Sequence, residues 1–300
     1  MRCRSALGLV WAWVLLAGPT GASDPPPSYE DEIRAWSERR VSRLRSDTGW
    51  LTVAGLFWLE PGENTFGTAP DNAIVLPSGS APEHAGVFVH ADGVTTVRAL
   101  TGTPLRCRDR DVTVLRLRTD AEDSTDVLEL GRLRFHVIVR SGRHGIRMRD
   151  LESPMRRDFH GIDSWPVDRA WRIEARFEPY DPPRHVAIPT ILGTVDSMLC
   201  PGALVFELQG QRCRLEPVIE SPDDPSLFVI FADATNGDET YGAGRFLYAE
   251  MPKNGRTIVD FNKAYNPPCA FTPYATCPLP PPQNELALPV RAGEKKYGEH

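Results

Sequence analysis

The chain has 300 residues, of which 41% are hydrophobic, and a formal net charge of −6. Its basic residues alternate with acids, as in the segment RCRDRD at 106–111, so no concentrated basic face is predicted. A protein that binds the phosphates of nucleic acid needs such a face, and we therefore expect no nucleic-acid partner.

The first 22 residues have the pattern of a signal peptide. Arg2 and Arg4 precede an apolar run at 7–17, and the small residues Gly21 and Ala22 end the segment. The run is too short to span the roughly 30 Å of a bilayer core as a helix, so we expect cleavage and no stable membrane span. The mature protein is then secreted or periplasmic, and loss of the two arginines changes its net charge from −6 to −8.

Residues 23–49 are expected to form a leader and one amphipathic helix. A proline run at 25–27 favours an extended start. Ser28 and Asp31 have the spacing of a helix N-terminal cap, and apolar residues follow at near-helical spacing up to Leu44. The sequence therefore predicts a helix over about 28–46.

Short strands with turn signals between them are predicted from residue 50 to residue 140. They fall at 50–59, 73–76, 86–90, 94–100, 112–117 and 127–139, with breaks at Pro61-Gly62, Asp92-Gly93 and Thr101-Gly102. Regular strands of this kind are typical of a β-sandwich. The segments at 63–67, 72–77, 84–88 and 128–135 resemble the layout of the forkhead-associated β-sandwich.

The resemblance to forkhead-associated domains does not extend to their phosphate-binding residues. That family reads phosphothreonine through an Arg and a Ser, and the matching positions here are Thr68 and Ala81. We therefore interpret this sandwich as a scaffold and expect no phosphopeptide partner.

A second unit is predicted over residues 141–300. An irregular junction at 146–171 leads to strands at 171–177, 185–195, 203–208, 213–215, 226–231, 245–248 and 257–261. Strands joined by short turns suggest a curved antiparallel sheet. The expected fold class is thus mostly β: an N-terminal helix, a forkhead-associated-like β-sandwich, then an antiparallel β-barrel-like unit with a Pro-rich tail.

The densest unusual sequence lies at 233–245 and 260–269. Together with the segments at 145–150 and 177–184, it resembles a bacterial secreted family catalogued as domain of unknown function 1684. The likeness runs over nearly the whole mature chain, and it implies no activity, because none is attached to that family.

Polar side chains of the segments at 233–245 and 260–269, within the tail of the chain (233–300), are the candidates for a ligand site. In an extended strand, Asp260 and Asn262 would share one face because side chains alternate. A carboxylate, an arginine and tyrosines gathered there would suit a small polar or anionic ligand. The candidate ligand-binding residues are Asp233, Thr235, Thr240, Tyr241, Arg245, Asp260, Asn262, Lys263 and Tyr265.

Three alternatives to a ligand pocket remain open. Asp233, Asn236, Asp238 and Glu239 carry oxygen ligands for calcium, but their spacing does not follow the EF-hand loop. An envelope hydrolase would use Asp233 or Asp260 with Arg245 orienting the substrate. The polar groups of the tail are otherwise purely structural, within a β scaffold.

No catalytic motif decides whether the protein is an enzyme. The sequence has no Gly-x-Ser-x-Gly elbow, no His-Glu-x-x-His, no phosphate loop and no dinucleotide fingerprint. No catalytic residue is therefore assigned. We expect no cofactor and no metal centre.

Five cysteines follow the expected cleavage point, and Cys269 and Cys277 are the best disulfide candidates because they bracket a short Pro-rich segment. Export would place them in oxidising surroundings. Closing so short a loop stabilises by about 2.5 kcal/mol in the chain-entropy description.

Overall fold

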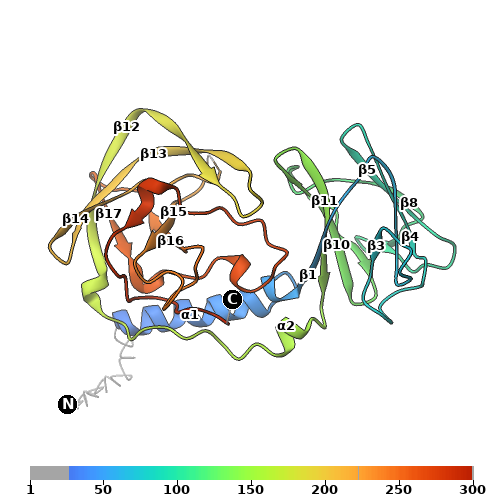
Figure 1. Cartoon of the computed structure of the whole chain (residues 1–300), viewed down its shortest axis with the longest axis horizontal. Helices are drawn as coiled ribbons and strands as arrows, with labels where there is room; N and C mark the ends of the chain where they lie inside the picture. Colours follow the sequence, from blue (N-terminus) through green and yellow to red (C-terminus); the bar gives the residue numbers. More distant parts are fainter. Residues whose placement is uncertain (1–26, 222, 299–300) are drawn as a thin grey trace, which may run out of the picture.

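A computed structural model describes residues 27–221 and 223–298 of the chain. The expected signal peptide at 1–22, and with it the start of the leader, lies outside these residues. The described chain is mostly β, as predicted, and its strands form two units that lie side by side along the long axis (Figure 1). No helix in the described ranges has both the length and the apolar character needed to cross a membrane.

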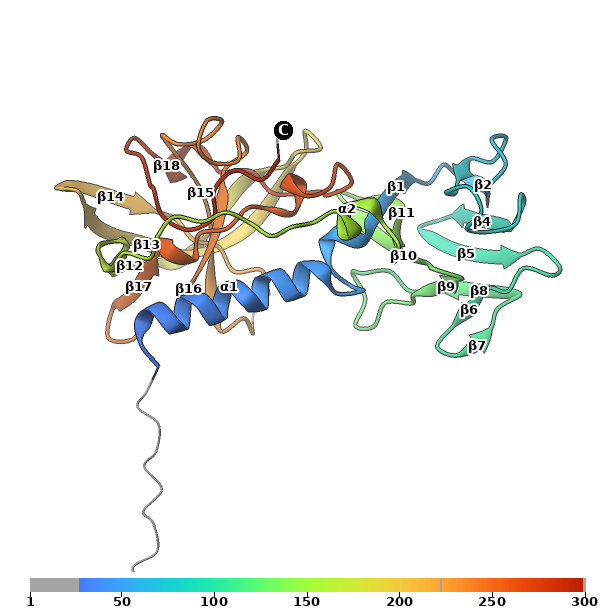
Figure 2. The same ribbon diagram turned by 90° about the horizontal axis from the view of Figure 1, so that it is seen from below.

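Helix α1 (Tyr29–Arg45) begins where its capping residues predict. The side chain of Ser28 accepts from the backbone N–H of Asp31 at 3.1 Å, and the Asp31 carboxylate accepts from the backbone N–H of Ser28 at 3.2 Å. Reciprocal bonds of this kind satisfy backbone donors that a helix start leaves free. Its buried residues are Tyr29, Ile33 and Leu44. The helix runs along the second unit (Figure 2).

The first unit is a β-sandwich of a six-stranded sheet, in the order β1-β11-β10-β9-β6-β7, and a five-stranded sheet, in the order β3-β2-β4-β5-β8. Its strands are β1 (Val53–Trp58), β2 (Gly62–Gly67), β3 (Ile74–Val75), β4 (Gly86–Ala91), β5 (Val94–Ala99), β6 (Arg106–Cys107), β7 (Arg110–Asp111), β8 (Val114–Leu117), β9 (Leu128–Leu130), β10 (Leu133–Arg140) and β11 (Arg143–Asp150).

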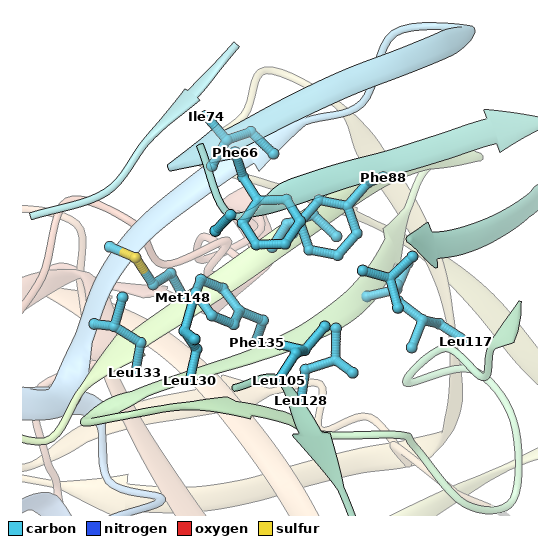
Figure 3. Close-up of a cluster of buried hydrophobic side chains, with 14 of the residues drawn as sticks. Phe66, Ile74, Phe88, Leu105, Leu117, Leu128, Leu130, Leu133, Phe135 and Met148 are labelled. Carbon is cyan, nitrogen blue, oxygen red and sulfur yellow. The ribbon is translucent and has the colours of Figure 1, made fainter. Parts of the chain in front are cut away.

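Three phenylalanines fill the core between these two sheets (Figure 3). Phe66 and Phe88 come from the five-stranded sheet, and Phe135 comes from the six-stranded sheet. Their ring centroids lie 4.7 to 6.5 Å apart, and none of the three is more than 1% exposed. Burial of each ring contributes about 1.5–3 kcal/mol, so this cluster ties the sheets together.

The second unit contains a four-stranded sheet, in the order β14-β13-β12-β17, and a three-stranded sheet, in the order β16-β15-β18. Its strands are β12 (Arg172–Pro189), β13 (Val195–Leu208), β14 (Gln211–Leu215), β15 (Ser226–Asp233), β16 (Arg245–Glu250), β17 (Arg256–Asp260) and β18 (Glu285–Leu286). Among the described residues, the backbone pairing leaves these sheets open, so they do not form a closed barrel. Strand β15 is buried on both faces, as its apolar run predicts.

Short helical turns and the chain between the units complete the structure. Helix α2 (Pro154–Arg157) lies in the segment that leads from the sandwich to the second unit (Figure 2). The remaining turns are the 3-10 segments η1 (Trp50–Thr52), η2 (Arg169–Trp171), η3 (Phe261–Lys263), η4 (Pro268–Ala270) and η5 (Pro282–Asn284).

Several elements differ from the sequence expectations. Strand β11 occupies part of the expected junction and extends the sandwich sheet past residue 140 to Asp150. The expected strand at 127–139 is divided at Gly131, whose φ of 55° suits a residue without a Cβ. Two expected strands merge into β12, whose register shifts between Pro179 and Arg184 because prolines cannot donate to the ladder.

Candidate functional site

Arg245 and Asp233 form a sealed ion pair inside the second unit. Arg245 begins β16 and Asp233 ends β15, and neither side chain is exposed. The guanidinium donates to the Asp233 carboxylate at 2.7 Å and to the carbonyls of Val290 and Ala292 at 2.7 and 2.6 Å. Burial lowers the pKa of Arg245, and the Asp233 carboxylate opposes that effect. This pair therefore anchors the C-terminal segment and does not face a pocket.

Gly244 allows the backbone to place Arg245 in the buried site beside Asp233. Its φ is +85°, and an added Cβ would lie 2.7 Å from the carbonyl oxygen of Phe231 and 2.4 Å from the ring of Pro280. Only glycine fits so close an approach of two segments. The Gly-x-Gly sequence before β16 is thus a packing requirement.

The polar groups of the loop after β15 bind one another and neighbouring parts of the tail. The hydroxyls of Thr235 and Thr240 are 2.8 Å apart, and the Asn236 amide donates to Thr240 at 2.9 Å. The Tyr241 hydroxyl donates to the carbonyl of Cys269 at 3.2 Å. Of the residues of the calcium alternative, Asp233 pairs with Arg245, the Asn236 side-chain oxygen accepts from the backbone N–H of Asp233 at 2.6 Å, and Glu239 pairs with Arg291. No metal-holding group of three His, Cys, Asp or Glu occurs within the described ranges.

Asp260, Asn262 and Lys263 lie under the first turn of α1. Strand β17 ends at Asp260, and the turn η3 replaces the expected strand continuation, so Asp260 caps that turn. The Tyr29 hydroxyl donates to Asp260 Oδ1 at 2.8 Å, while Oδ2 accepts no hydrogen bond and lies 3.8 Å from the Lys263 ammonium. These contacts attach α1 to the tail, and none of them is shared with Arg245.

Tyr265 lies in a third place, against the middle of α1. Its ring stacks parallel to that of Tyr248, with 6.2 Å between centroids, and the Arg40 guanidinium lies 4.4 Å above it. The nine residues predicted as one site are therefore divided among a buried core, the start of α1 and this aromatic stack. They do not line a single pocket.

A pocket of about 460 Å³ lies where α1, the sandwich and the second unit meet, and we call it the inter-unit pocket. Four parts of the chain line it: the α1 region (Arg40, Leu44, Trp50), β10 and β11 (Arg140, Arg147) with the Asp196 hairpin, β15 and β16 (Phe228, Phe246, Tyr248) with Glu220, and the tail (Tyr265, Thr276, Cys277). Of the predicted residues, only Tyr265 and Cys277 belong to it.

Arg147 is the unusual group of this pocket. It is 4% exposed, its Nη2 donates to the Thr276 hydroxyl at 3.3 Å, and its guanidinium carbon lies 5.1 Å from the centre of the Trp50 ring. Its Nε is buried without a hydrogen-bond partner, and no carboxylate of the described chain forms an ion pair with it. Burial, reinforced by the nearby charge of Arg140, lowers the pKa of Arg147 to about 10, so it is charged at neutral pH.

The other two arginines of the inter-unit pocket already have partners. Arg40 binds Glu294 at 2.7 Å and the carbonyl of Asn266 at 2.7 Å. Arg140 binds Asp120 at 2.7 Å. Arg147 is therefore the arginine of this pocket that has no opposite charge beside it, and a ligand could supply that charge.

Arg147, Trp50 and Tyr248 line this pocket and are not among the residues predicted from the sequence. They come from distant parts of the chain, so no motif joins them. The available signal was Arg147 itself, a cation between Ile146 and Met148 in a segment with apolar neighbours. Because the segment was interpreted as an irregular junction, that signal had no structural setting.

The structural role of Arg245 predicts a large loss of stability in the Arg245→Ala variant. Removing one partner of a buried ion pair leaves the other charge without compensation and costs about 3–5 kcal/mol. Chemical denaturation of the two proteins measures this loss. Arg291→Ala, which breaks the exposed pair with Glu239, is the control and should unfold close to the wild type. Equal midpoints for Arg245→Ala and the wild type would contradict the anchoring role.

His136 predicts an acid-sensitive stability. It pairs across the sheet with Arg147, and burial, together with the charges of Arg147 and Arg149, lowers its pKa from 6.5 to about 4. Between these pH values the unfolded chain binds a proton that the folded chain does not, so stability falls as pH drops from 6.5 towards 4. Chemical denaturation at several pH values should show that the free energy of unfolding falls less between pH 6.5 and pH 4 in His136→Asn than in the wild type. The exposed-site control His160→Asn should retain the wild-type slope, and an unchanged slope in His136→Asn would refute the assignment.

The comparisons with known proteins identify relatives without assigning an activity. A family model described as a protein of unknown function (DUF1684) matches residues 157–295. None of the curated proteins matches the chain.

Solved structures similar to the chain fall into two groups. An uncharacterized protein from Haloarcula marismortui, solved by NMR in solution, is 32% identical over 49% of this chain and 83% of its own, with a TM-score of 0.42. A phosphothreonine-dependent FHA domain is 17% identical over 31% of this chain and 92% of its own, with a TM-score of 0.23. The second FHA domain of a Mycobacterium tuberculosis ABC transporter is 26% identical over 30% of this chain and 77% of its own, also with a TM-score of 0.23.

Proposed function

Because the chain belongs to the family of proteins of unknown function (DUF1684), its family supplies no activity, and we propose from its geometry that it binds a small anionic ligand in the inter-unit pocket. The observation that carries the proposal is Arg147, a buried guanidinium in the pocket wall that has no carboxylate partner. The ligand's anionic group would supply that partner.

The free energy of burying a charge supports an anionic ligand. Removing a guanidinium from water is costly unless hydrogen bonds and an opposite charge compensate. Thr276 and the Trp50 ring give Arg147 only a neutral hydrogen bond and a cation–π contact. A carboxylate or phosphate can accept two parallel N–H bonds from one guanidinium, which makes such pairs stronger than neutral hydrogen bonds.

The remaining charges of the pocket limit the size of the anion's charge. Arg40 and Arg140 add positive potential although each has its own carboxylate. Asp196 and Glu220 also line the pocket, and the exposed Glu220 accepts from the Tyr248 hydroxyl at 2.6 Å. These acids disfavour a highly charged polyanion, so a ligand with one anionic group fits best.

The aromatic wall favours a ligand with a flat apolar part. Phe228 stacks on Tyr248 with 5.0 Å between centroids, and Tyr248 stacks on Tyr265. Pockets of roughly 300–1,000 Å³ with mainly apolar walls and a few polar groups are typical small-molecule sites. We therefore infer a monoanionic carboxylate or phosphate ester with an aromatic or similarly flat body.

Neither a hydrolase based on Arg245 nor a phosphopeptide binder has comparable support. Arg245 and Asp233 are fully buried, pair with each other and bind the backbone of the tail, so they offer no exposed group to a substrate. Thr68 and Ala81 stand where phosphothreonine-binding donors would be needed, and neither carries a charge. A purely structural scaffold remains as the outcome in which no anion binds.

If the pocket binds an anion through Arg147, the Arg147→Met variant should lose affinity for anionic ligands. Wild-type protein should bind phenyl phosphate and benzoate, and benzyl alcohol should bind weakly because it has no charge. Loss of a charged hydrogen bond costs about 1.5–3 kcal/mol, so affinity should fall by about tenfold or more. Isothermal titration calorimetry measures these affinities. NMR titration adds an independent readout, because an anion at Arg147 should raise the pKa of its cross-strand neighbour His136.

Arg143→Met is the matched control for this titration. Arg143 lies on the same strand, but its guanidinium stacks on the ring of Trp58 at 4.3 Å, outside the inter-unit pocket. Its affinity for the probes should equal that of the wild type. Failure of the wild type to bind either aromatic anion at millimolar concentration would refute the proposal and leave the scaffold interpretation.

We also propose that this binding takes place outside the cytoplasm, in the periplasm or in the medium. The support is the basic start and the apolar run of residues 1–22. Expression of the full chain should yield exported protein whose N-terminal sequence begins near residue 23. Leu15→Asp, which interrupts the apolar run, should keep the protein inside the cell, and an unprocessed exported wild type would contradict cleavage.

A further inference from the structure

Cys269 and Cys277 are neighbours in the folded tail. The backbone N–H of Cys269, in η4, donates to the sulfur of Cys277 at 3.2 Å. All five cysteines of the described chain are free thiols, and the other three contact oxygen atoms of Asp126, Gly202 and Gln211. Of these five thiols, only Cys269 and Cys277 are therefore in position to react with each other.

The environments of these two thiols differ. Cys277 is 3% exposed and belongs to a hydrophobic cluster, whereas Cys269 packs at its edge and is partly exposed. A hydrogen bond from the Cys277 thiol lowers the pKa of Cys269, and the Tyr241 hydroxyl acts in the same direction. The same bond between the thiols, together with burial, raises the pKa of Cys277. Cys269 is thus the better nucleophile and Cys277 the retained thiol.

We propose that Cys269 and Cys277 form a reversible dithiol–disulfide site, in which Cys269 reacts with external disulfides and Cys277 resolves the product. The contact between the two residues and their unequal exposure carry this inference, which goes beyond anion binding in the inter-unit pocket and does not depend on it. The partner is a low-molecular-weight disulfide.

The exchange proceeds in two balanced steps. The Cys269 thiolate attacks one sulfur of the external disulfide, which forms a mixed disulfide and releases one thiolate. The Cys277 thiol gives its proton to solvent and attacks the Cys269 sulfur, which closes the Cys269–Cys277 bond and releases the second thiolate. The protein loses two electrons, and the external disulfide is reduced to two thiols.

This site differs from the structural staple that the sequence alone predicts. A structural staple is closed permanently, whereas the pair described here exists as two thiols in contact and closes when an oxidant is present. Because Thr276 accepts the hydrogen bond from Arg147 and Cys277 lines the inter-unit pocket, closure would act beside that pocket.

Oxidised glutathione is the probe for this proposal, applied to the folded protein that begins at residue 23. Alkylation before and after reduction, followed by peptide mass mapping, should show Cys269 and Cys277 joined, and dithiothreitol should restore both thiols. Cys277→Ser should accumulate glutathione on Cys269, whereas Cys269→Ser should leave Cys277 without it. Cys213→Ser is the control and should form the same bond as the wild type.

Alkylation rates in the unmodified protein provide a test that needs no variant. Near neutral pH, Cys269 should react with iodoacetamide about tenfold faster than Cys277, because the lower pKa and greater exposure act together. Two thiols that stay alkylatable after treatment with oxidised glutathione would overturn the proposal. Preferential modification of Cys277 would overturn the assignment of the attacking thiol, and a bond that dithiothreitol cannot open in the folded protein would overturn reversibility.

Discussion

The inter-unit pocket depends on one buried guanidinium that is not part of it. Arg245 holds the backbone of residues 290–294 by donating to their carbonyl oxygens while it pairs with Asp233. The carboxylate of Glu294, fixed in this way, accepts hydrogen bonds from Arg40 of α1 and from the backbone N–H of Asn266. The helix and the segment that carries Tyr265 are thereby held at the pocket wall, so a contact in the core positions a surface feature.

The proposed binding site is a property of the whole fold because no single unit contains it. Arg147 belongs to the sandwich, the aromatic stack belongs to the second unit, and α1 closes one side. Direct bonds hold these parts in place, including Arg149 to the carbonyl of Gly49 at 2.5 Å and Thr272 to the carbonyl of Val53 at 2.9 Å. The sandwich thus contributes Arg140 of β10 and Arg147 of β11 to the pocket wall.

Local patterns predicted local structure well and the site poorly. Ser28 and Asp31 predicted the start of α1 because a cap involves residues three positions apart, and apolar alternation predicted most strands of the sandwich. Strand β17 was predicted to continue beyond Asp260, but Asp260 caps the turn η3 there. The Asn262 amide still donates to the Asp260 carboxylate at 3.2 Å, and both side chains bind the Tyr29 hydroxyl of α1. Arg245 was predicted to bind a ligand because sequence cannot tell which partner satisfies a guanidinium. The contact between Trp50 and Arg147 spans about a hundred residues and leaves no periodic signal.

The bond between Tyr29 and Asp260 joins residues 231 positions apart, and this separation constrains how the protein is made. A chain emerging from the ribosome presents α1 first and its docking surface last. The sandwich, whose strands lie between residues 53 and 150, can close while the remainder is still being synthesised. The apolar face of α1 must wait, uncovered, until the final segment arrives. A chain stopped before residue 260 would therefore combine a finished sandwich with an undocked helix, a form suited to capture by chaperones or proteases.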